Sequence, residues 1–555
     1  MIDNFRFVRY NYLYSLHNPD AASGQVSIER EMIIMQTIPF LAQYSIRSKQ
    51  AYIFRTNRLA EIIGGSELIA DAFKLLFDCA GELNLKLRRA TGQEFIREEI
   101  LAQFEAGSLD LVELFRGGGN DTILFRNQSV FARLNRAYTL RLLRECPGMI
   151  PLCVGTALEE CRDYAADYKR LMQAADREKN RMLTGGVPVS QPFAMMDRTT
   201  FQPLSKIWAQ NGKEYRRSDE AYAKLNVGWQ SHKTDLSNAM LDGLVTEKDE
   251  ESLLAIVHAD GNNMGVKIQN MLDGHSDYDY CVKAMREFTE EISKVFSVSG
   301  KKAVDECTKA AEQAQLFGLK QKNSYKVRWV VCDGDDATFI CNARLAKLLA
   351  EAYLNAVDQY RGENEAERYS SCAGICIFHS HYPVARAYAL AEQACDSAKD
   401  PIHAAAVRAK QKKQPVPEEG WLDFHYIRGG MGDNLDEIRD RHGVSAILAR
   451  PWKVCGGADD HPKNVKKLDA LAETLLKAKF NRSNLKAFGA AYEEDQSLGE
   501  LEWERATRML EKDKLNKINA VFSDKAARFR ALYDLSEVYD LWYRPHSAAQ
   551  TDEEG

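Results

Sequence analysis

The stretch VRWVVCDGDDATFIC, residues 327–341, places a short acidic turn between two apolar runs. An Asp-Gly step between apolar runs is the strongest short-range signal of a β-hairpin, so residues 333–336 are predicted to form its tip. Upstream, LLAIVHADGNNMG, residues 253–265, is predicted to be a buried strand followed by a turn and a helix. If these strands are neighbours, their acidic residues converge at one edge of a sheet.

Asp260, Asp335 and Asp336 are the candidate catalytic and metal-binding residues. Hard divalent cations such as Mg²⁺ or Mn²⁺ prefer oxygen ligands and leave coordination positions for substrate phosphates. Two cations held by shared carboxylates can activate a 3′-hydroxyl and stabilise a leaving pyrophosphate. The alternative is that Asp-Gly and Asn-Asn simply form turns, which these residues favour.

Backbone amides at the start of a helix suit phosphate oxygens, so the residues around Asp260 and the hairpin tip are nucleotide-binding candidates. They are Gly261, Asn262, Asn263, Gly265 and Gly334. Lys399, near the end of a helix predicted over 384–399, is a further phosphate candidate. The alternative for Lys399 is an exposed lysine at a helix end, which the helix dipole favours.

An earlier segment shows the same order of elements, which indicates an internal repeat. QAYIFRTNRLAEIIGGSELIADAF, residues 50–73, is predicted to be strand, turn and helix, and LVELFRGGGNDTILFRN, residues 111–127, to be a hairpin with its tip at 119–121. In this copy Asn57 replaces Asp260, and Asp121 is the one remaining hairpin acid. A degenerate domain without a full metal site is expected, although α/β segments in general share such a pattern.

The first copy also contains Gly64-Gly65-Ser66, predicted to open a helix. The N-terminus of that helix could bind a phosphate, which makes these three residues nucleotide-binding candidates. Close packing of backbones explains two glycines equally well.

The length of 555 residues predicts three or four domains, and 45% hydrophobic with 28% charged residues is ordinary for a globular chain. The pattern favours an α+β fold with two domains in which strands and helices alternate and a helical C-terminal domain. The predicted parts are an N-terminal extension (1–30), a degenerate first domain (31–185), an irregular connector (186–250), a second domain (251–430) and a helical domain (431–555).

The overall charge argues against a chain coated in nucleic acid, because 74 basic residues face 80 acidic ones, a net charge of −6. The twelve cysteines include no Cys-x-x-Cys pair, so a zinc ribbon is not expected. No uninterrupted apolar run of about 18 residues is present, which excludes a membrane span. With no secretion signal, a cytoplasmic location is predicted.

These motifs together resemble the large palm-domain subunit of type III CRISPR effector complexes, the CRISPR polymerase. That family has two ferredoxin-like palm domains, so the resemblance implies an α+β fold with two such domains here. Its second palm bears a GGDD hairpin, which 333–336 resembles, and the strand-end motif resembles 258–265. Weaker similarity extends over 370–399, 421–427 and further stretches between about 50 and 455. Asp333 departs from the pattern, because it replaces the first glycine of GGDD.

The resemblance implies a metal-dependent nucleotidyltransferase that joins ATP molecules into cyclic oligoadenylate messengers in antiviral defence. It implies Mg²⁺ or Mn²⁺ held by Asp260, Asp335 and Asp336, and partners that include guide RNA, target RNA and other effector subunits. The family's HD nuclease domain and zinc-binding cysteine clusters have no recognised counterpart, so DNA cleavage is not expected.

Three other functions stay open from the sequence. The chain could be a non-catalytic scaffold for RNA and protein, although the three retained aspartates argue against this. It could form another cyclic nucleotide, because nothing in the sequence fixes the base. A template-dependent polymerase would need a broad basic groove, which the net charge of −6 does not suggest.

Overall fold

The structure, a computed structural model, describes residues 38–543 with short gaps. The gaps are 57, 91–93, 159–160, 183–193, 211, 232–240, 247–250, 320–321, 362–367, 413, 415, 431, 433, 442 and 458–459. The predicted N-terminal extension and Asn57 therefore lie outside the described residues, as does part of the predicted connector. Within the described residues, no helix is both long and apolar enough to span a bilayer.

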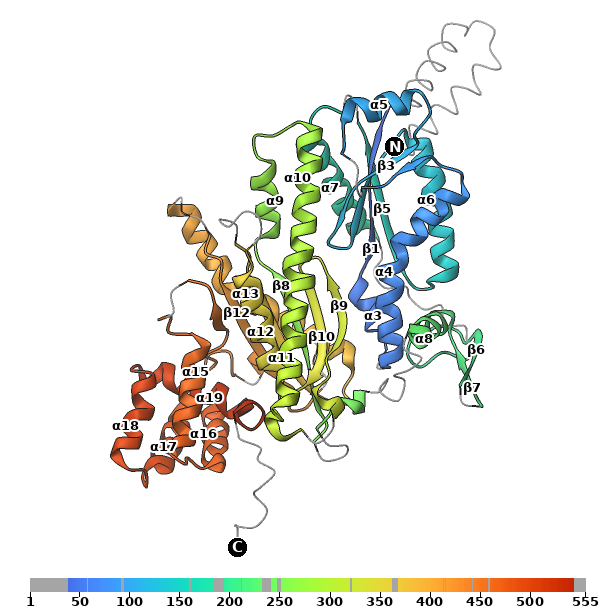
Figure 1. The fold of residues 1–555 in the computed structure, drawn as a ribbon. Helices are drawn as coiled ribbons and strands as arrows, with labels where there is room; N and C mark the ends of the chain where they lie inside the picture. The colour runs from blue at the N-terminus through green and yellow to red at the C-terminus, as the bar shows by residue number, and fades with distance from the viewer. Residues whose placement is uncertain are drawn as a thin grey trace, which may run out of the picture.

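The first sheet has five strands in the order β2-β3-β4-β1-β5 (Figure 1). The strands are β1 Phe40–Arg47, β2 Leu87–Arg88, β3 Leu111–Gly117, β4 Asn120–Phe125 and β5 Ile150–Ala157. Alternation along β1 sends Tyr44 to a face covered by α4 (Leu59–Glu82) and α6 (Gln128–Glu145). The opposite face, with Leu41, packs on α5 (Arg97–Glu105) and α7 (Tyr164–Arg181).

The second sheet has six strands in the order β13-β12-β11-β8-β10-β9. The strands are β8 Leu253–Gly261, β9 Arg328–Asp333, β10 Asp336–Asn342, β11 Ser371–His379, β12 Gly420–Tyr426 and β13 Trp452–Cys455. One face packs on α12 (Ala346–Gln359) and the C-terminal helices. The other packs on α13 (Val384–Lys412) and on residues of the first domain, where Phe54 stacks on Tyr388 with ring centroids 4.3 Å apart.

Four strands of each sheet share one topology, which confirms the predicted pair of palm domains. In each, the first strand lies between the second strand of a hairpin and a later antiparallel strand, as β1 lies between β4 and β5, and β8 between β10 and β11. The hairpins are β3–β4 and β9–β10. We name residues 40–181 the first palm and residues 253–426 the second palm.

The first strand of the first palm is not where the sequence predicted it. Residues 50–56 were expected to be a strand, but Lys49–Ile53 form the short helix α3 and the strand is β1. A short apolar run cannot be assigned to strand or helix by periodicity alone. Because Ala337 pairs with Ala259, the next pair is Asp336 with Asp260, and the matching pair in the first sheet is Asn120 with Ser45. Ser45, not Asn57, thus takes the place of Asp260.

One long helical segment runs beside both palms (Figure 1). It consists of α10 (Tyr278–Ile292), a π-helical segment η3 (Ser293–Gly300) and α11 (Lys301–Gln313). The guanidinium of Arg286 donates to the carbonyl of Leu114 on β3, and Ser297 Oγ lies 3.3 Å from the carbonyl oxygen of Gly334. The segment therefore contacts both hairpins.

The connector adds a small unit against the first palm. It forms β6 (Lys206–Gln210), β7 (Lys213–Arg217) and α8 (Asp219–Ser231), and α8 packs across α4. Also present are α9 (Met264–Leu272) after β8 and α14 (Leu435–Arg441) after β12.

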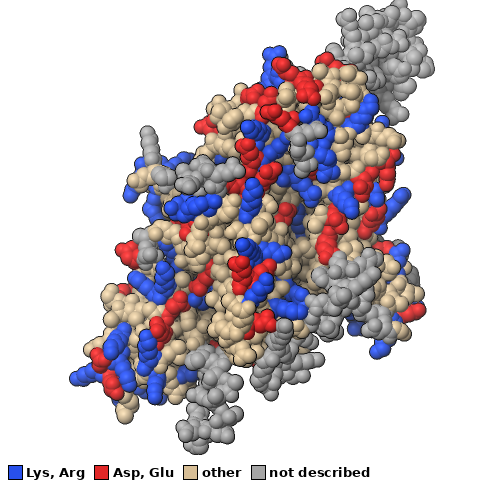
Figure 2. Space-filling view, in the orientation of Figure 1, with Lys and Arg blue, Asp and Glu red and all other residues tan. Residues whose placement is uncertain are grey.

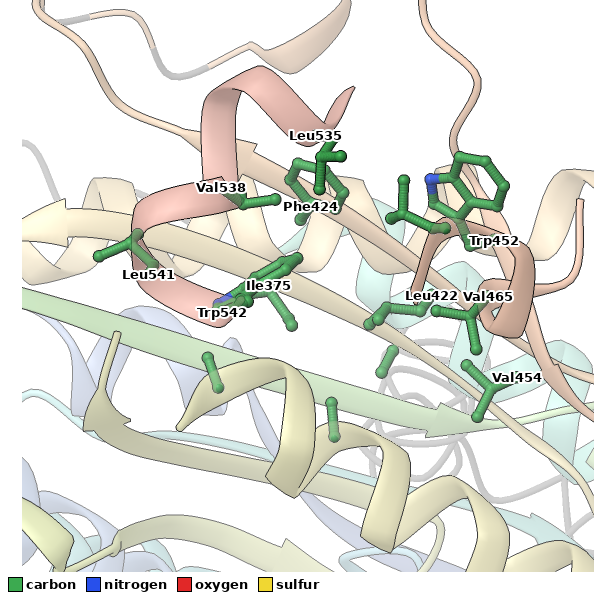
Figure 3. Packing of buried hydrophobic residues seen from close by; sticks show 14 of the residues in the cluster. Ile375, Leu422, Phe424, Trp452, Val454, Val465, Leu535, Val538, Leu541 and Trp542 are labelled. Carbon is green, nitrogen blue, oxygen red and sulfur yellow. The ribbon is translucent and has the colours of Figure 1, made fainter. Parts of the chain in front are cut away.

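The C-terminal region is helical as predicted, with one exception. Its helices are α15 Val465–Lys477, α16 Arg482–Glu494, α17 Gln496–Thr507, α18 Lys512–Val521 and α19 Lys525–Trp542. The strand β13 precedes them and joins the edge of the second sheet. In Figure 3, Trp542 and Val538 of α19 pack over Phe424 of β12, so this region shares its core with the second palm.

Candidate functional site

The predicted acidic hairpin is present, and its register brings the three aspartates to one end of the second sheet. Asp336 opens β10 opposite Asp333 of β9, which leaves Gly334 and Asp335 as a two-residue turn. Gly334 has φ +63°, a conformation that glycine adopts without steric cost. Asp260 follows Ala259 on β8, one position beyond the Ala337–Ala259 pair.

Asp260 is paired with a lysine rather than free. The ammonium group of Lys399 donates to Asp260 Oδ2 and lies 3.5 Å from the carbonyl oxygen of Gly261. Burial lowers the pKa of Lys399, but Asp260, together with the nearby Cys395 and Cys372, outweighs burial, so the pKa is raised. Lys399 lies in the middle of α13 and not near its end as predicted, since the helix continues to Lys412 through Pro401.

Asp336 is held by a residue of the first palm. Gln50 Nε2 donates to Asp336 Oδ2 over 3.2 Å, whereas Asp336 Oδ1 lies 3.5 Å from His258 Nδ1. Burial, and then the charge of Asp260, raise the pKa of Asp336 to about 7 and that of Asp335 to about 6. Repulsion between these carboxylates is the expected consequence of an acidic cluster without a compensating cation.

The carboxylate oxygens of the three aspartates suit a hard metal cation that binds together with substrate phosphates. Asp336 Oδ1 is buried and accepts no hydrogen bond from the described residues, so one carboxylate oxygen is free to bind a ligand. Among those residues, no three acidic, histidine or cysteine side chains are preorganised around a single point. Mg²⁺ usually binds through one or two carboxylates plus waters and substrate phosphates, and Asp335 and Asp336 could provide such a pair, with Asp260 beside them.

The residues after Asp260 lie at the start of α9, as predicted, but their side chains differ in role. Asn262 is buried and donates to Ser370 Oγ (2.9 Å) and to the carbonyl of Glu419 (3.0 Å), which ties β8 to the starts of β11 and β12. Asn263 has φ +60° and precedes the helix, and a side chain at Gly265 would meet no atom within 4 Å. The backbone at Gly265 is therefore the accessible part of this segment.

Two glycines beside the aspartates allow close approach of backbone. A Cβ on Gly261 would lie 2.8 Å from Asp335 Cβ, and a Cβ on Gly334 would lie 2.8 Å from the Cα of Gly118. The second distance shows that the tips of the two hairpins abut. Gly334 therefore serves the contact between palms, whereas its predicted role in binding nucleotide stays a prediction.

A cavity of about 490 Å³ lies between the palms at this contact. Asp333, Asp335 and Asp336 line one side, and the first palm contributes β1, α3, α4 and the tip of its hairpin. Four cationic side chains of the first palm line it: Arg47, Lys49, Arg116 and Lys179. On the face shown in Figure 2, basic and acidic side chains are interspersed rather than gathered in a broad basic surface. The cavity thus opposes cations of one palm to carboxylates of the other.

Gly64 and Gly65 do not open a helix, which corrects the sequence prediction. They lie inside α4, which begins at Leu59. A Cβ on Gly64 would lie 1.9 Å from the carbonyl oxygen of Lys224, so this glycine allows α8 to cross α4. No phosphate could reach Gly64, and Gly65 is likewise buried against Ile53 and Lys224. Ser66 does line the cavity, and its Oγ donates to the carbonyl of Val330.

The acid expected at the first hairpin is not at its tip. The turn is Gly118–Gly119, and Asp121 lies on β4, fully buried. Burial, followed by the charge of Glu113, raises the pKa of Asp121 well above its usual range. The first palm therefore presents no carboxylate at its hairpin tip, and the lack of a full metal site in this palm stays a prediction.

Several residues at the site were not singled out from the sequence: Arg47, Lys49, Gln50, Arg116, Lys179 and His258. Arg47, Lys49 and Gln50 come from β1 and α3, a strand and a helix that the sequence reading misplaced. Arg116 lies on β3 and Lys179 on α7. His258 lay within the quoted motif, and strand alternation places it on the same face as Asp260. That alternation was the available signal.

Comparisons with known proteins agree with this geometry. Residues 253–405 match the family model described as the second palm domain of Cas10/Cmr2. No curated protein matches the chain. Three solved structures of a Csm1-Csm4 cassette are similar in fold: with pppApApA (TM-score 0.51, 11% identity), with pppApA (0.50, 12%) and with one ATP (0.50, 13%).

The likeness to those structures extends over nearly the whole chain. It covers 91%, 93% and 91% of this chain and 70%, 70% and 69% of the respective structures. At such low identity it shows the fold, and the family model adds the identity of the acidic domain. The chain therefore contains a second palm domain of the Cas10/Cmr2 type, within a fold that is similar to the Csm1-Csm4 cassette structures over most of its length.

Proposed function

We propose that the chain is a nucleotidyl cyclase that converts ATP into cyclic oligoadenylates with Mg²⁺ or Mn²⁺. The observation on which the proposal depends is the inter-palm cavity, where Asp335 and Asp336 face cationic side chains of the first palm. The similar structures are complexes of other proteins with ATP, pppApA and pppApApA, which supports adenine nucleotides as ligands here.

The reaction would join two nucleotides by attack of a 3′-hydroxyl oxygen on an α-phosphorus. The new bond is P–O3′, the bond that breaks is from the α-phosphorus to the bridging oxygen, and pyrophosphate leaves. A cation held by Asp260, Asp335 and Asp336 would supply activation of the hydroxyl and neutralisation of the leaving group. The chain itself supplies the three carboxylates, two of them raised in pKa by burial.

The first palm would act as the acceptor side. Its hairpin tip holds no carboxylate, so it has fewer ligands for a cation, while Arg47, Arg116 and Lys179 could bind the acceptor's phosphates. Positioning of two reactants can contribute roughly 7–11 kcal/mol to lowering a barrier, so a palm without a cation of its own can still be essential. In the first palm, the basic side chains of Arg47, Arg116 and Lys179 therefore replace Gly64 and Gly65 as the candidates for phosphate binding.

Partners are part of the proposal. The cassette structures pair Csm1 with Csm4, so this chain is proposed to assemble with another effector subunit. Guide and target RNA are proposed as further partners and as the source of activation. The ammonium group of Lys399 donates to Asp260. When a metal cation binds Asp260 instead, this ammonium group would donate to a phosphate oxygen of the nucleotide.

The test is to incubate the purified chain with α-³²P-labelled ATP, GTP, CTP or UTP and with Mg²⁺ or Mn²⁺. Each reaction is run with and without guide and target RNA, and with and without partner subunits. A cyclic adenylate product that is lost in Asp335→Ala/Asp336→Ala supports the proposal. Absence of product from every nucleotide in the complete complex would reject it in favour of a scaffold.

A further inference from the structure

The two hairpins are held together by α3, a helix of five residues that belongs to the first palm. Lys49 Nζ donates to the carbonyl of Gly119 at the tip of the first hairpin over 3.0 Å. The next residue, Gln50, donates to Asp336 beside the turn of the second hairpin over 3.2 Å. Adjacent residues of one helix thus contact both hairpins.

Lys49 also lies against the acidic side of the contact. A Cβ built on Gly119 would lie 1.6 Å from Lys49 Nζ and 3.3 Å from Asp333 Oδ2, so ammonium and carboxylate flank the same glycine. Lys49 is half-buried, and charge buried in this way must be paired to be tolerated. The carbonyl of Gly119 accepts a hydrogen bond from the ammonium group, and the charge of Asp333 on the opposite palm partly offsets the lowering of the Lys49 pKa by burial.

Among the described residues, the second palm donates no hydrogen bond to Asp336 Oδ2. In that palm, His258 Nδ1 lies 3.5 Å from the other oxygen of Asp336, and Thr338 Oγ1 is 2.9 Å from the same imidazole nitrogen. The amide of Gln50 therefore fixes one carboxylate oxygen and leaves Oδ1 without a hydrogen bond from the described residues. An oriented carboxylate with one free oxygen is suited to binding a cation.

We propose that Lys49 and Gln50 are positioning residues by which the first palm sets the geometry of the acidic hairpin on the second. Lys49 fixes the two hairpin tips against each other, and Gln50 fixes the rotamer of Asp336. Neither residue bonds to the reacting atoms. The part of the proposal that concerns turnover rests on the proposed nucleotidyl transfer, whereas the structural part does not.

The structural part is tested by hydrogen–deuterium exchange of the full chain without nucleotide or cation. In Lys49→Met, amides of residues 111–125 and 328–342 should exchange about tenfold faster than in the wild type, the factor expected for loss of one charge-assisted hydrogen bond. Lys49→Arg, which keeps the donor and the charge, should restore most of the protection. Lys74→Met, at an exposed position on α4, is the matched control and should change neither hairpin.

Unaltered exchange in both hairpins of a folded Lys49→Met chain would overturn the proposal, whether or not the protein makes a nucleotide product. A change confined to the first hairpin would also overturn it, because the bridge between palms would then be absent. Melting temperatures of the variants show that the comparison is made between folded chains.

The functional part is tested by steady-state kinetics in the active complex. In Gln50→Met, kcat should fall about tenfold while KM for ATP stays within about twofold, because the change disorients a carboxylate without removing a contact to substrate. A rise in KM at constant kcat would instead make Gln50 a substrate-binding residue and overturn the positioning role. Complete inactivity of the wild type would reject the proposed function, and the exchange measurement would still decide the role of Lys49.

Discussion

The ammonium group of Lys399 on α13 pairs with the carboxylate of Asp260 at the end of β8. A lysine that neutralises a proposed cation ligand competes with the cation. We expect Lys399→Met to bind Mn²⁺ alone about tenfold more tightly than the wild type, because Asp260 is then unpaired. The same variant should show a higher KM for ATP, because it lacks the ammonium group that would bind the phosphates of ATP.

Calorimetric titration with Mn²⁺ and kinetics with ATP measure the two effects of Lys399→Met separately. Lys410→Met, near the end of the same helix, is the control. An affinity for Mn²⁺ that does not rise in Lys399→Met would show that Asp260 does not bind the cation.

The acidic hairpin should be required for synthesis and not for folding. In Asp335→Asn/Asp336→Asn, product formation should fall more than about a hundredfold, because cation stabilisation of such a transition state is worth several kcal/mol. Turn residues bury little apolar area, so the variant should keep its fold. Labelled ATP and circular dichroism provide the two measurements, and retained synthesis would contradict the site assignment.

The same two aspartates should make stability depend on pH. Their pKa values are about 6 and about 7 in the fold, against an ordinary value of about 3.9, so between these limits the folded chain binds more protons than the unfolded chain. Their contribution to stability therefore declines as the pH rises from about 4 to about 7.

Thermal melts in EDTA test this pH dependence. From pH 4 to pH 8, the Tm of Asp335→Asn/Asp336→Asn should rise relative to the Tm of the wild type. Adding Mg²⁺ should raise the wild-type Tm at pH 8 and have little effect at pH 4.5, where protonated carboxylates do not bind the cation. A constant difference across this range would contradict the raised pKa values.

Part of this site could be predicted from the sequence because its signals are local. The step Asp333-Gly334 between two apolar runs determines the hairpin, and the apolar run before Asp260 determines the strand. The contributions of Lys49 and Gln50 could not be predicted, because they depend on how one palm packs on the other. Periodicity within 50–56 does not distinguish α3 from a strand. The sequence therefore predicted a strand there and matched Asn57 to Asp260, whereas the residue that corresponds to Asp260 is Ser45 of β1.

The basic side chains that line the inter-palm cavity should contribute to nucleotide binding. Arg116→Gln and Lys179→Met should each raise KM for ATP about tenfold, the factor expected when one charged partner of a phosphate is lost. The hairpin of the second palm should be unaffected, so kcat should change little. Steady-state kinetics measure both parameters, with Arg136→Gln on the exposed side of α6 as the control. A loss confined to kcat would argue that these residues do not bind substrate.

Gly64 should matter for packing and not for phosphate binding. In Gly64→Ala the new Cβ would lie 1.9 Å from the carbonyl oxygen of Lys224, and α8 must move, at a cost of about 1–3 kcal/mol. Gly81 is the matched control, because it lies in the same helix and a Cβ there meets nothing within 4 Å. Gly81→Ala should stabilise the fold by about 0.5–1 kcal/mol through the lower conformational entropy of the unfolded chain.

Urea unfolding of Gly64→Ala and Gly81→Ala measures these opposite changes, and ATP titration measures binding. A phosphate cradle at Gly64 would predict weaker ATP binding at unchanged stability. The contact between α4 and α8 instead predicts lower stability at unchanged ATP binding, because Gly64 lies under the backbone of α8. The basic side chains that line the cavity come from other elements of the first palm. Normal stability together with lost ATP binding would therefore return Gly64 to the nucleotide site.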